Sequence, residues 1–208
     1  ADGFILKSDG DNLYISGGSN RGTLYGVYTL LEEYFGVRWF TPTLEVVPEN
    51  KDIVIDAKIN RTVNPSFSIR RNDTMGTNDA YRARTKMNVS FWSEAEAYGG
   101  ALTYVLWDVT LDKLVPDSLF ADHPEYFALN QDGTRQSGWG AQPCLSNPDV
   151  MNLVKEKVRS LLKDRPDAKI ISISQPDNGT AQKPCMCAQC KKIYAEEGAY
   201  SGAQIRFV

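Results

Sequence analysis

The sequence predicts an α/β protein, and three observations support this class. Residues 1–60 contain short strand patterns around one amphipathic helix, which is typical of a small sheet covered by a helix. Residues 147–174 contain a long amphipathic helix followed directly by a β-branched run. Strand and helix patterns alternate along residues 61–208, and such alternation favours the parallel arrangement of a (β/α) barrel.

The first sixty residues predict a small two-layer α/β domain. Apolar residues at 4–7 and 13–16 flank a polar loop, which indicates a hairpin. A helix is predicted over residues 21–35, because its apolar residues recur at helical spacing and Ser19 or Asn20 can cap its start. Two more short strands are predicted, at residues 37–40 and 53–55.

We place a domain boundary at residue 60, within a segment that has few apolar side chains. Residues 61–208 then form the second domain. Its clearest helix covers residues 150–163, after a capping Asn147 and before Pro166. The remaining predicted elements are strands at residues 67–73, 89–92, 102–107 and 169–174, helical segments at 79–87 and 111–120, and a hairpin turn at 130–133.

Composition and charge exclude several classes of function. The formal net charge is −3 and no basic stripe is present, which argues against a nucleic-acid partner. No apolar run reaches the length of a membrane span. His123 is the only histidine, so a histidine-based catalytic triad is excluded. The chain starts without Met and ends inside a helix pattern, so we expect the rest of a longer chain to be its partner.

The strand predicted at residues 169–174 runs directly into a polar turn, and this turn is the best candidate site. A barrel carries its chemistry where its strands end, so we predict Asp177 as a catalytic acid or base. Gln175 and Asn178 are predicted to contact the ligand of this site. The alternative is that Asp177, Asn178 and Gly179 only form a tight turn through side-chain hydrogen bonds.

Arg70, Arg71 and Asp73 end the first predicted strand of the second domain. Arginine side chains there can hold the carboxylate of a ligand. The alternative is a structural ion pair between arginine and aspartate. Trp92 closes another predicted strand and is expected to stack on a ligand ring, whereas a core position is the usual role of such a residue.

Two other tryptophans, Trp107 and Trp139, are further candidates for stacking on a ligand ring. Acid–base catalysis of hydrolysis commonly uses two carboxylates in different environments. Only Asp177 is a convincing one in this sequence, and Asp73 is second. We expect the partner carboxylate to lie beyond residue 208, so that these residues alone would be inactive.

All four cysteines lie in the second half of the chain: Cys144, Cys185, Cys187 and Cys190. Four thiolates can form a tetrahedral zinc site, and three of these cysteines come from one short loop. In an oxidising compartment the same residues would form disulfides. Cys144 would then pair with one of the other three, because a Cys185–Cys187 bridge would be strained. Structural zinc and disulfides both stay open, and either would hold the loop beside Asp177.

Several runs of residues resemble known families. Two runs in the first domain resemble the auxiliary α/β domain, domain 2, that precedes the catalytic barrel in glycoside hydrolase families 20 and 67: Gly22-Thr23-Leu24-Tyr25-Gly26-Val27-Tyr28 and Gly36-Val37-Arg38-Trp39-Phe40. Motifs of the second domain resemble a secreted bacterial family called domain of unknown function 4838. They are His123-Pro124-Glu125-Tyr126-Phe127, Cys144-Leu145, Ser174-Gln175, Asp177-Asn178, the Cys185–Cys190 cluster and Glu197-Gly198.

The resemblance implies a truncated (β/α)8 TIM-type barrel, with the chain ending about halfway round. It implies a carbohydrate ligand, specifically a complex glycan containing uronic acid or N-acetylhexosamine, and a secreted or periplasmic location, with an outer-surface lipid anchor as an alternative. Leu102 departs from the family pattern, which has histidine there. Two alternatives to a glycoside hydrolase are a non-catalytic glycan-binding module and a cysteine- or metal-stabilised interaction domain.

Overall fold

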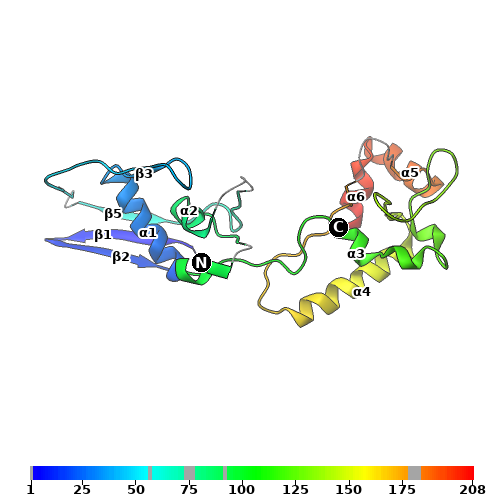
Figure 1. The fold of residues 1–208 in the computed structure, drawn as a ribbon, viewed down its shortest axis with the longest axis horizontal. Coiled ribbons are helices and arrows are strands. Elements are labelled where there is room, and N and C mark those ends of the chain that lie inside the picture. The colour runs from blue at the N-terminus through cyan, green and yellow to red at the C-terminus, as the bar shows by residue number, and fades with distance from the viewer. Residues whose placement is uncertain (1, 56–57, 73–77, 91–92, 178–183) are drawn as a thin grey trace. The chain divides into compact units, whose positions relative to one another are not determined.

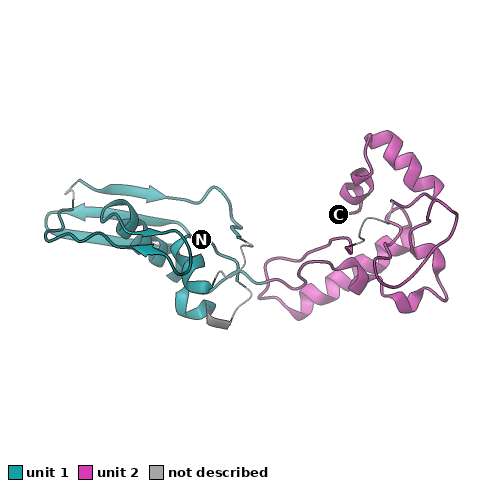
Figure 2. Cartoon of the chain, turned by 45° about the horizontal axis from the view of Figure 1, so that its top comes forward, with its two compact units in different colours: residues 1–103 teal, residues 104–208 magenta. Residues whose placement is uncertain are grey.

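The structure is a computed structural model, and it describes residues 2–55, 58–72, 78–90, 93–177 and 184–208 (Figure 1). Its fold is mixed α/β, as the sequence predicts. The chain forms two compact units, Ala1–Thr103 and Tyr104–Val208 (Figure 2). Compact units are not the same as independently folding domains, so the predicted domain boundary at residue 60 stays a prediction.

Unit 1 is built on a three-stranded antiparallel sheet of β1 (Phe4–Asp9), β2 (Asn12–Gly17) and β5 (Asn60–Val63). The strand order is β2-β1-β5, with Phe4 opposite both Gly17 and Val63. The predicted hairpin of β1 and β2 is therefore confirmed. The segment predicted as a linker contains β5, because β-branched Thr62 and Val63 complete the open edge of β1 through backbone hydrogen bonds.

Helix α1 (Asn20–Glu33) packs on this sheet. Ser19 begins it, since the Ser19 hydroxyl accepts a hydrogen bond from the Gly22 N–H at 3.1 Å. Tyr25 is 1% exposed and packs in one cluster with Phe4 and Leu6 of β1. A Cβ atom on Gly26 would lie 2.6 Å from the Ile15 side chain, so glycine there permits the close approach of helix and sheet.

The rest of unit 1 is short elements. Strands β3 (Arg38–Trp39) and β4 (Glu45–Val46) form a two-stranded ribbon, and α2 (Asp79–Arg84) is followed by the 3₁₀ helix η1 (Ser93–Tyr98). The strand predicted at residues 53–55 is wrong. Val54 is 86% exposed, and no strand among the described residues pairs with this segment.

Asp2 holds the first part of the chain against the residues before and after α2. Its carboxylate accepts hydrogen bonds from the Arg21 Nε at 2.9 Å, the Arg70 Nη2 at 2.6 Å and the Asn88 Nδ2 at 2.7 Å. Burial by itself would raise the pKa of this carboxyl group, but the hydrogen bonds from Arg21, Arg70 and Asn88 outweigh burial and lower the pKa. Asp2 is therefore ionised in the folded protein and joins three separate segments of unit 1.

Unit 2 is mainly helical. It contains α3 (Leu111–Leu114), α4 (Pro148–Asp164), α5 (Ala188–Glu197) and α6 (Ser201–Phe207), with 3₁₀ helices η2 (Asp117–Leu119) and η3 (Pro124–Tyr126). Asn147 caps α4 by accepting from the Asp149 N–H at 2.8 Å. The core joins α3, α4, α5 and α6 around Leu111, Phe127 and Val150. Of the helices in the described ranges, none is both long and apolar enough to cross a membrane.

Helix prediction in unit 2 is confirmed for α4 and partly wrong at residues 111–120. That segment divides into α3 and η2, because Pro116 lacks the N–H that a continuous helix requires there.

The strands predicted at residues 67–73, 102–107 and 169–174 are not regular strands in their described parts. Isolated parallel bridges occur instead, between Val89 and Leu102 in unit 1 and between Tyr104 and Ile170 in unit 2. In unit 2 the Val105 N–H donates to the Ile170 carbonyl at 2.8 Å, and the Ser172 N–H donates to the Leu106 carbonyl at 3.1 Å. The direction of pairing is therefore parallel, while the ladder is too short for a strand.

We expect Asp2→Ala to lower the free energy of unfolding of unit 1 by about 3 kcal/mol at pH 7, because Arg21 and Arg70 would lose a buried partner. The measurement is hydrogen exchange of the β1 amides with increasing urea. The pKa of Asp2 is lower in the folded state than in the unfolded state, so its stabilisation is present above the unfolded pKa, about 4, and is lost as the pH falls through the folded pKa.

The control is Glu33→Gln, which removes an exposed ion pair with Arg61 and should change stability by less than about 0.5 kcal/mol. Equal effects of the two substitutions would contradict the role of Asp2.

Candidate functional site

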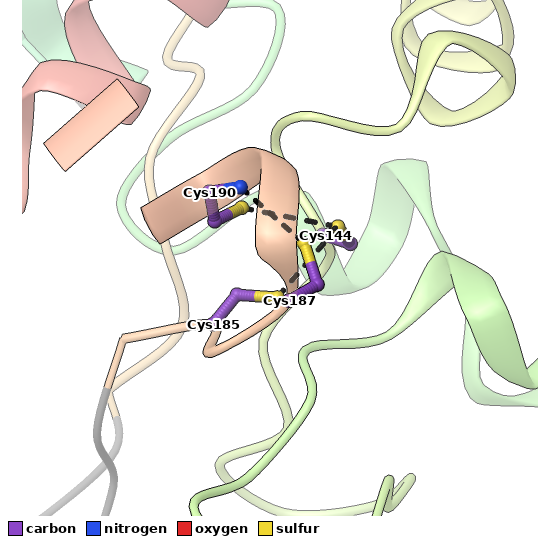
Figure 3. Close-up of side chains that lie close together, drawn as sticks. All are labelled: Cys144, Cys185, Cys187 and Cys190. Atoms are coloured by element: carbon purple, nitrogen blue, oxygen red, sulfur yellow. Dashed lines mark hydrogen bonds between the residues drawn. The ribbon is translucent and has the colours of Figure 1, made fainter. Parts of the chain in front are cut away.

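The four cysteines come together in unit 2 from two loops and one helix (Figure 3). Cys144 lies in the loop before α4, Cys185 and Cys187 lie in the loop before α5, and Cys190 lies in the first turn of α5. All four Sγ atoms lie within 4.8 Å of one another. Three of the residues are buried and Cys187 is half-buried, so the cluster is largely shielded from solvent.

Backbone hydrogen bonds to residues 126–129 bring the two loops together. The Cys144 N–H donates to the Tyr126 carbonyl at 2.7 Å, and the Ala128 N–H donates to the Gln142 carbonyl at 2.7 Å. From the other side, the Met186 N–H donates to the Leu129 carbonyl at 2.7 Å. One extended segment therefore positions cysteines that are about forty residues apart in the sequence.

The spacing of the sulfur atoms matches a tetrahedral metal site. A zinc ion with Zn–S bonds of about 2.3 Å requires neighbouring sulfurs about 3.8 Å apart. The Cys144 Sγ lies 3.7 Å from the Cys185 Sγ, 3.8 Å from the Cys187 Sγ and 4.0 Å from the Cys190 Sγ. All four cysteines are free thiols in the structure. The geometry thus fits four metal ligands, and none of these pairs is at the bonding distance of a disulfide.

Backbone N–H groups donate to two of the sulfurs, and the thiols also form hydrogen bonds with one another. The Leu129 N–H donates to the Cys185 Sγ at 3.3 Å, and the Cys190 N–H donates to the Cys187 Sγ at 3.4 Å, which makes Cys187 the cap of α5. The positive end of the α5 dipole therefore faces the cluster. The thiols of Cys185 and Cys190 can donate to the Cys144 sulfur, which lowers the pKa of Cys144 and raises the pKa of both donors.

Two neighbouring side chains complete the surroundings of the cluster. The Ser146 Oγ lies 3.0 Å from the Cys190 Sγ and 3.5 Å from the sulfurs of Cys144 and Cys187. Tyr194 packs against the cluster, and burial together with the nearby cysteines raises the pKa of its phenol. Tyr194 therefore remains a neutral side chain beside the cysteines.

Asp177 lies in a second feature of unit 2, a pocket of about 260 Å³ that we name the Asp177 pocket. Asp112 and Asp117 also line it, and so does Trp139, whose side chain is 83% exposed. The flanking Gly138 and Gly140 have φ angles of 91° and 80°, which other residues rarely adopt. This glycine-flanked turn presents the indole beside the carboxylates.

Gln175 is exposed and lines a different cavity, of about 280 Å³, that we name the amide pocket. Gln142 and Gln204 line it as well, together with Tyr194, Tyr200 and Cys185. Cys185 therefore belongs both to the cysteine cluster and to the wall of the amide pocket.

Arg70 and Arg71 lie in unit 1. Arg70 donates through Nε to the Lys86 carbonyl, through Nη1 to the Phe67 carbonyl and through Nη2 to Asp2. These bonds correspond to the structural alternative considered for Arg70, with Asp2 as the acid. Arg70 also lines an open pocket of about 520 Å³. Three other predicted contact residues lie outside the described residues: Asp73, Trp92 and Asn178.

The sequence prediction missed Asp112, Asp117, Gln142 and Gln204. Asp112 and Asp117 carry no sequence signal of their own, since short exposed acids around a helical turn are common. Trp139, in contrast, was among the predicted stacking residues, and the glycine on each side of it is a further sequence signal of an exposed turn.

The structure defines a mixed α/β protein with a four-cysteine site and two pockets beside it. A family model described as domain of unknown function (DUF4838) matches residues 39–208, and the chain belongs to this family. No curated protein and no solved structure gives a significant match.

We expect all four thiols to react with an alkylating reagent when the protein is denatured without a reductant, because the sulfurs lie at ligand rather than bonding distances. Intact-mass measurement should show four labels per chain. Two labels or none would show that disulfides form instead.

Proposed function

We propose that this chain is part of a carbohydrate-active, glycoside hydrolase-like protein that binds a glycan in the Asp177 pocket. One observation carries the proposal: an indole that is 83% exposed lies in the same pocket as several carboxylates. The indole of Trp139 offers a flat apolar face on which a sugar ring can stack. Asp177, Asp112 and Asp117 offer acceptors for sugar hydroxyl groups around it.

The pocket also offers the groups that hydrolysis requires. Retaining and inverting glycoside hydrolases use two carboxylates, one on each side of the scissile bond. Asp177 supplies one of them in our proposal, and Asp112 or Asp117 supplies the other from within this chain. The proposed second carboxylate therefore does not depend on residues beyond 208.

A (β/α) barrel is the proposed architecture of the intact protein. The two parallel bridges support it, because a barrel consists of parallel neighbours that follow one another in the sequence. Asp177 comes after the segment that pairs with Tyr104–Leu106, at the carboxyl end of the proposed strand. Active sites of barrels lie at that end.

We assign the cysteine cluster a structural role in this proposal, with zinc as the bound ion. Four cysteine ligands leave no open position for a substrate or a reactive water, so such a site stabilises the loops and does no chemistry. A secreted or periplasmic location remains part of the proposal. A bound ion would protect the thiols from oxidation there.

A non-catalytic glycan-binding module is the second candidate function. Exposure of Asp112, Asp117 and Asp177 favours it, because closed active sites normally shield their carboxylates from water. Both candidates place the glycan against Trp139, and they differ only in turnover.

We expect the purified protein to contain one zinc ion per chain, measured by elemental analysis. Cys190→Ser should reduce the zinc content to less than a tenth, because a hydroxyl group is a poor replacement for a buried thiolate ligand. Met186→Leu is the control, since Met186 lies in the same loop and contributes no sulfur to the cluster. Equal zinc content in the two variants would refute the tetrathiolate site.

We expect the intact protein to bind glycans on an array and Trp139→Ala to weaken the strongest hit by about tenfold or more, because stacking of a ring on one aromatic side chain contributes on the order of 1–3 kcal/mol. Phe120→Leu, outside the residues that line the pocket, is the control.

Turnover of the same glycan separates the two candidate functions. An enzyme should lose turnover in Asp177→Asn while keeping most of its binding. Binding without product in the unmodified protein would favour the non-catalytic module.

A further inference from the structure

The amide pocket has the composition of a site for an uncharged polar ligand. Glutamine amides line it from three segments, Gln142, Gln175 and Gln204, and the side chains of Tyr200 and Ser201 complete its rim. None of its described lining residues is an acid, a lysine or an arginine. Its volume of about 280 Å³ is sufficient for one sugar ring.

Two amide oxygens in the wall of the pocket lack a partner among the described residues. Gln142 is 6% exposed, and its Nε2 donates to the Pro176 carbonyl at 2.7 Å, which fixes the orientation of the amide. Its Oε1 is buried and receives no hydrogen bond. Gln204 donates through Nε2 to the Ile173 carbonyl at 3.3 Å, and its Oε1 is likewise buried without a donor.

An unpaired buried acceptor is unfavourable, so a donor supplied by a ligand stabilises the pair. Both oxygens are shielded from water here, so a small movement of each amide would expose it to the hydroxyl donors that a glycan carries. A site built to bond a hydroxyl group also discriminates strongly against ligands that lack one.

The amide pocket adjoins the Asp177 pocket. Pro143 lines both of them. Gln175 and Asp177 are two residues apart on the same segment and line one pocket each. The Gln142–Pro176 hydrogen bond joins the walls of the two pockets. A ligand longer than one sugar ring that passes over these shared residues would reach both pockets.

Charge selects among the glycans. Asp112, Asp117 and Asp177 line one pocket, and no lysine or arginine is among the described lining residues of either. A uronic acid would bring a carboxylate next to these aspartates, which is unfavourable.

We infer that the amide pocket is a second saccharide subsite, beside the Asp177 pocket, and that the two together bind an uncharged glycan of at least two sugar units and discriminate against uronic acids. This inference rests on the proposed function. It names the class of glycan and a second set of contact residues, Gln142, Gln175 and Gln204.

The test measures binding of the whole chain to defined neutral tetrasaccharides (gluco-, manno-, galacto- and xylo-) and to the tetrasaccharides of galacturonic and glucuronic acid. We expect the best neutral ligand to bind at least tenfold more tightly than either acidic one. Gln204→Ala should weaken the neutral tetrasaccharide about tenfold and leave the matching monosaccharide unchanged, because the monosaccharide needs only the Asp177 pocket.

Gln136→Ala is the matched control, since Gln136 is an exposed glutamine outside both pockets. If Gln204→Ala lowers the melting temperature by more than a few degrees, Gln175→Ala replaces it, because Gln175 is exposed and lines the same pocket.

The outcomes separate the inference from the proposed function. Binding that depends on Trp139 but not on Gln204 or Gln175 would overturn the second subsite and keep the proposed function. Acidic tetrasaccharides that bind as tightly as neutral ones would overturn the selection by charge. Absence of any glycan binding would overturn both.

Discussion

Convergence of four thiols is the interaction on which unit 2 depends. Regular sheet is absent from the described part of this unit, so hydrogen-bonded ladders do not fix the loops before α4 and α5. The sulfurs of Cys144, Cys185, Cys187 and Cys190 do so instead, together with the backbone of residues 126–129. The small apolar cluster around them contains Ala128 and Leu129. Holding several thiolates together without a cation is electrostatically unfavourable, which is why the geometry favours a metal ion.

The cluster is connected to both pockets through shared residues. Cys185 and Tyr194 belong to the cluster region and also line the amide pocket. Gln142 lies two residues before Cys144, and its side chain binds the Pro176 carbonyl next to Asp177. The four-cysteine site and the proposed ligand site therefore share residues. The residues that hold the loops together also determine where the amides and the carboxylates lie.

Local sequence signals were sufficient for the elements whose stability is mainly local. Helices α1 and α4 were predicted within a few residues, since each has a capping side chain and an apolar face. The β1–β2 hairpin was predicted because two apolar runs flank a short polar loop, which is also a local signal. Strand β5 was not predicted, because its apolar content is low and its pairing with β1 joins residues more than fifty positions apart. The segments at Tyr104 and Ile170 pair in parallel, but their short ladder depends on distant contacts that periodicity does not reveal.

The sequence by itself determined the chemistry of this protein: an α/β composition, the capped helices, a set of four cysteines and an acid after a β-branched run. Residue types and local spacing encode these features directly. Only the tertiary structure decided that Cys144 lies at metal-ligand rather than disulfide distances from the other three cysteines, that Arg70 binds Asp2, and that Trp139 shares a pocket with Asp177. Each of these contacts joins residues far apart in the chain, and the packing of the whole unit determines which distant groups meet.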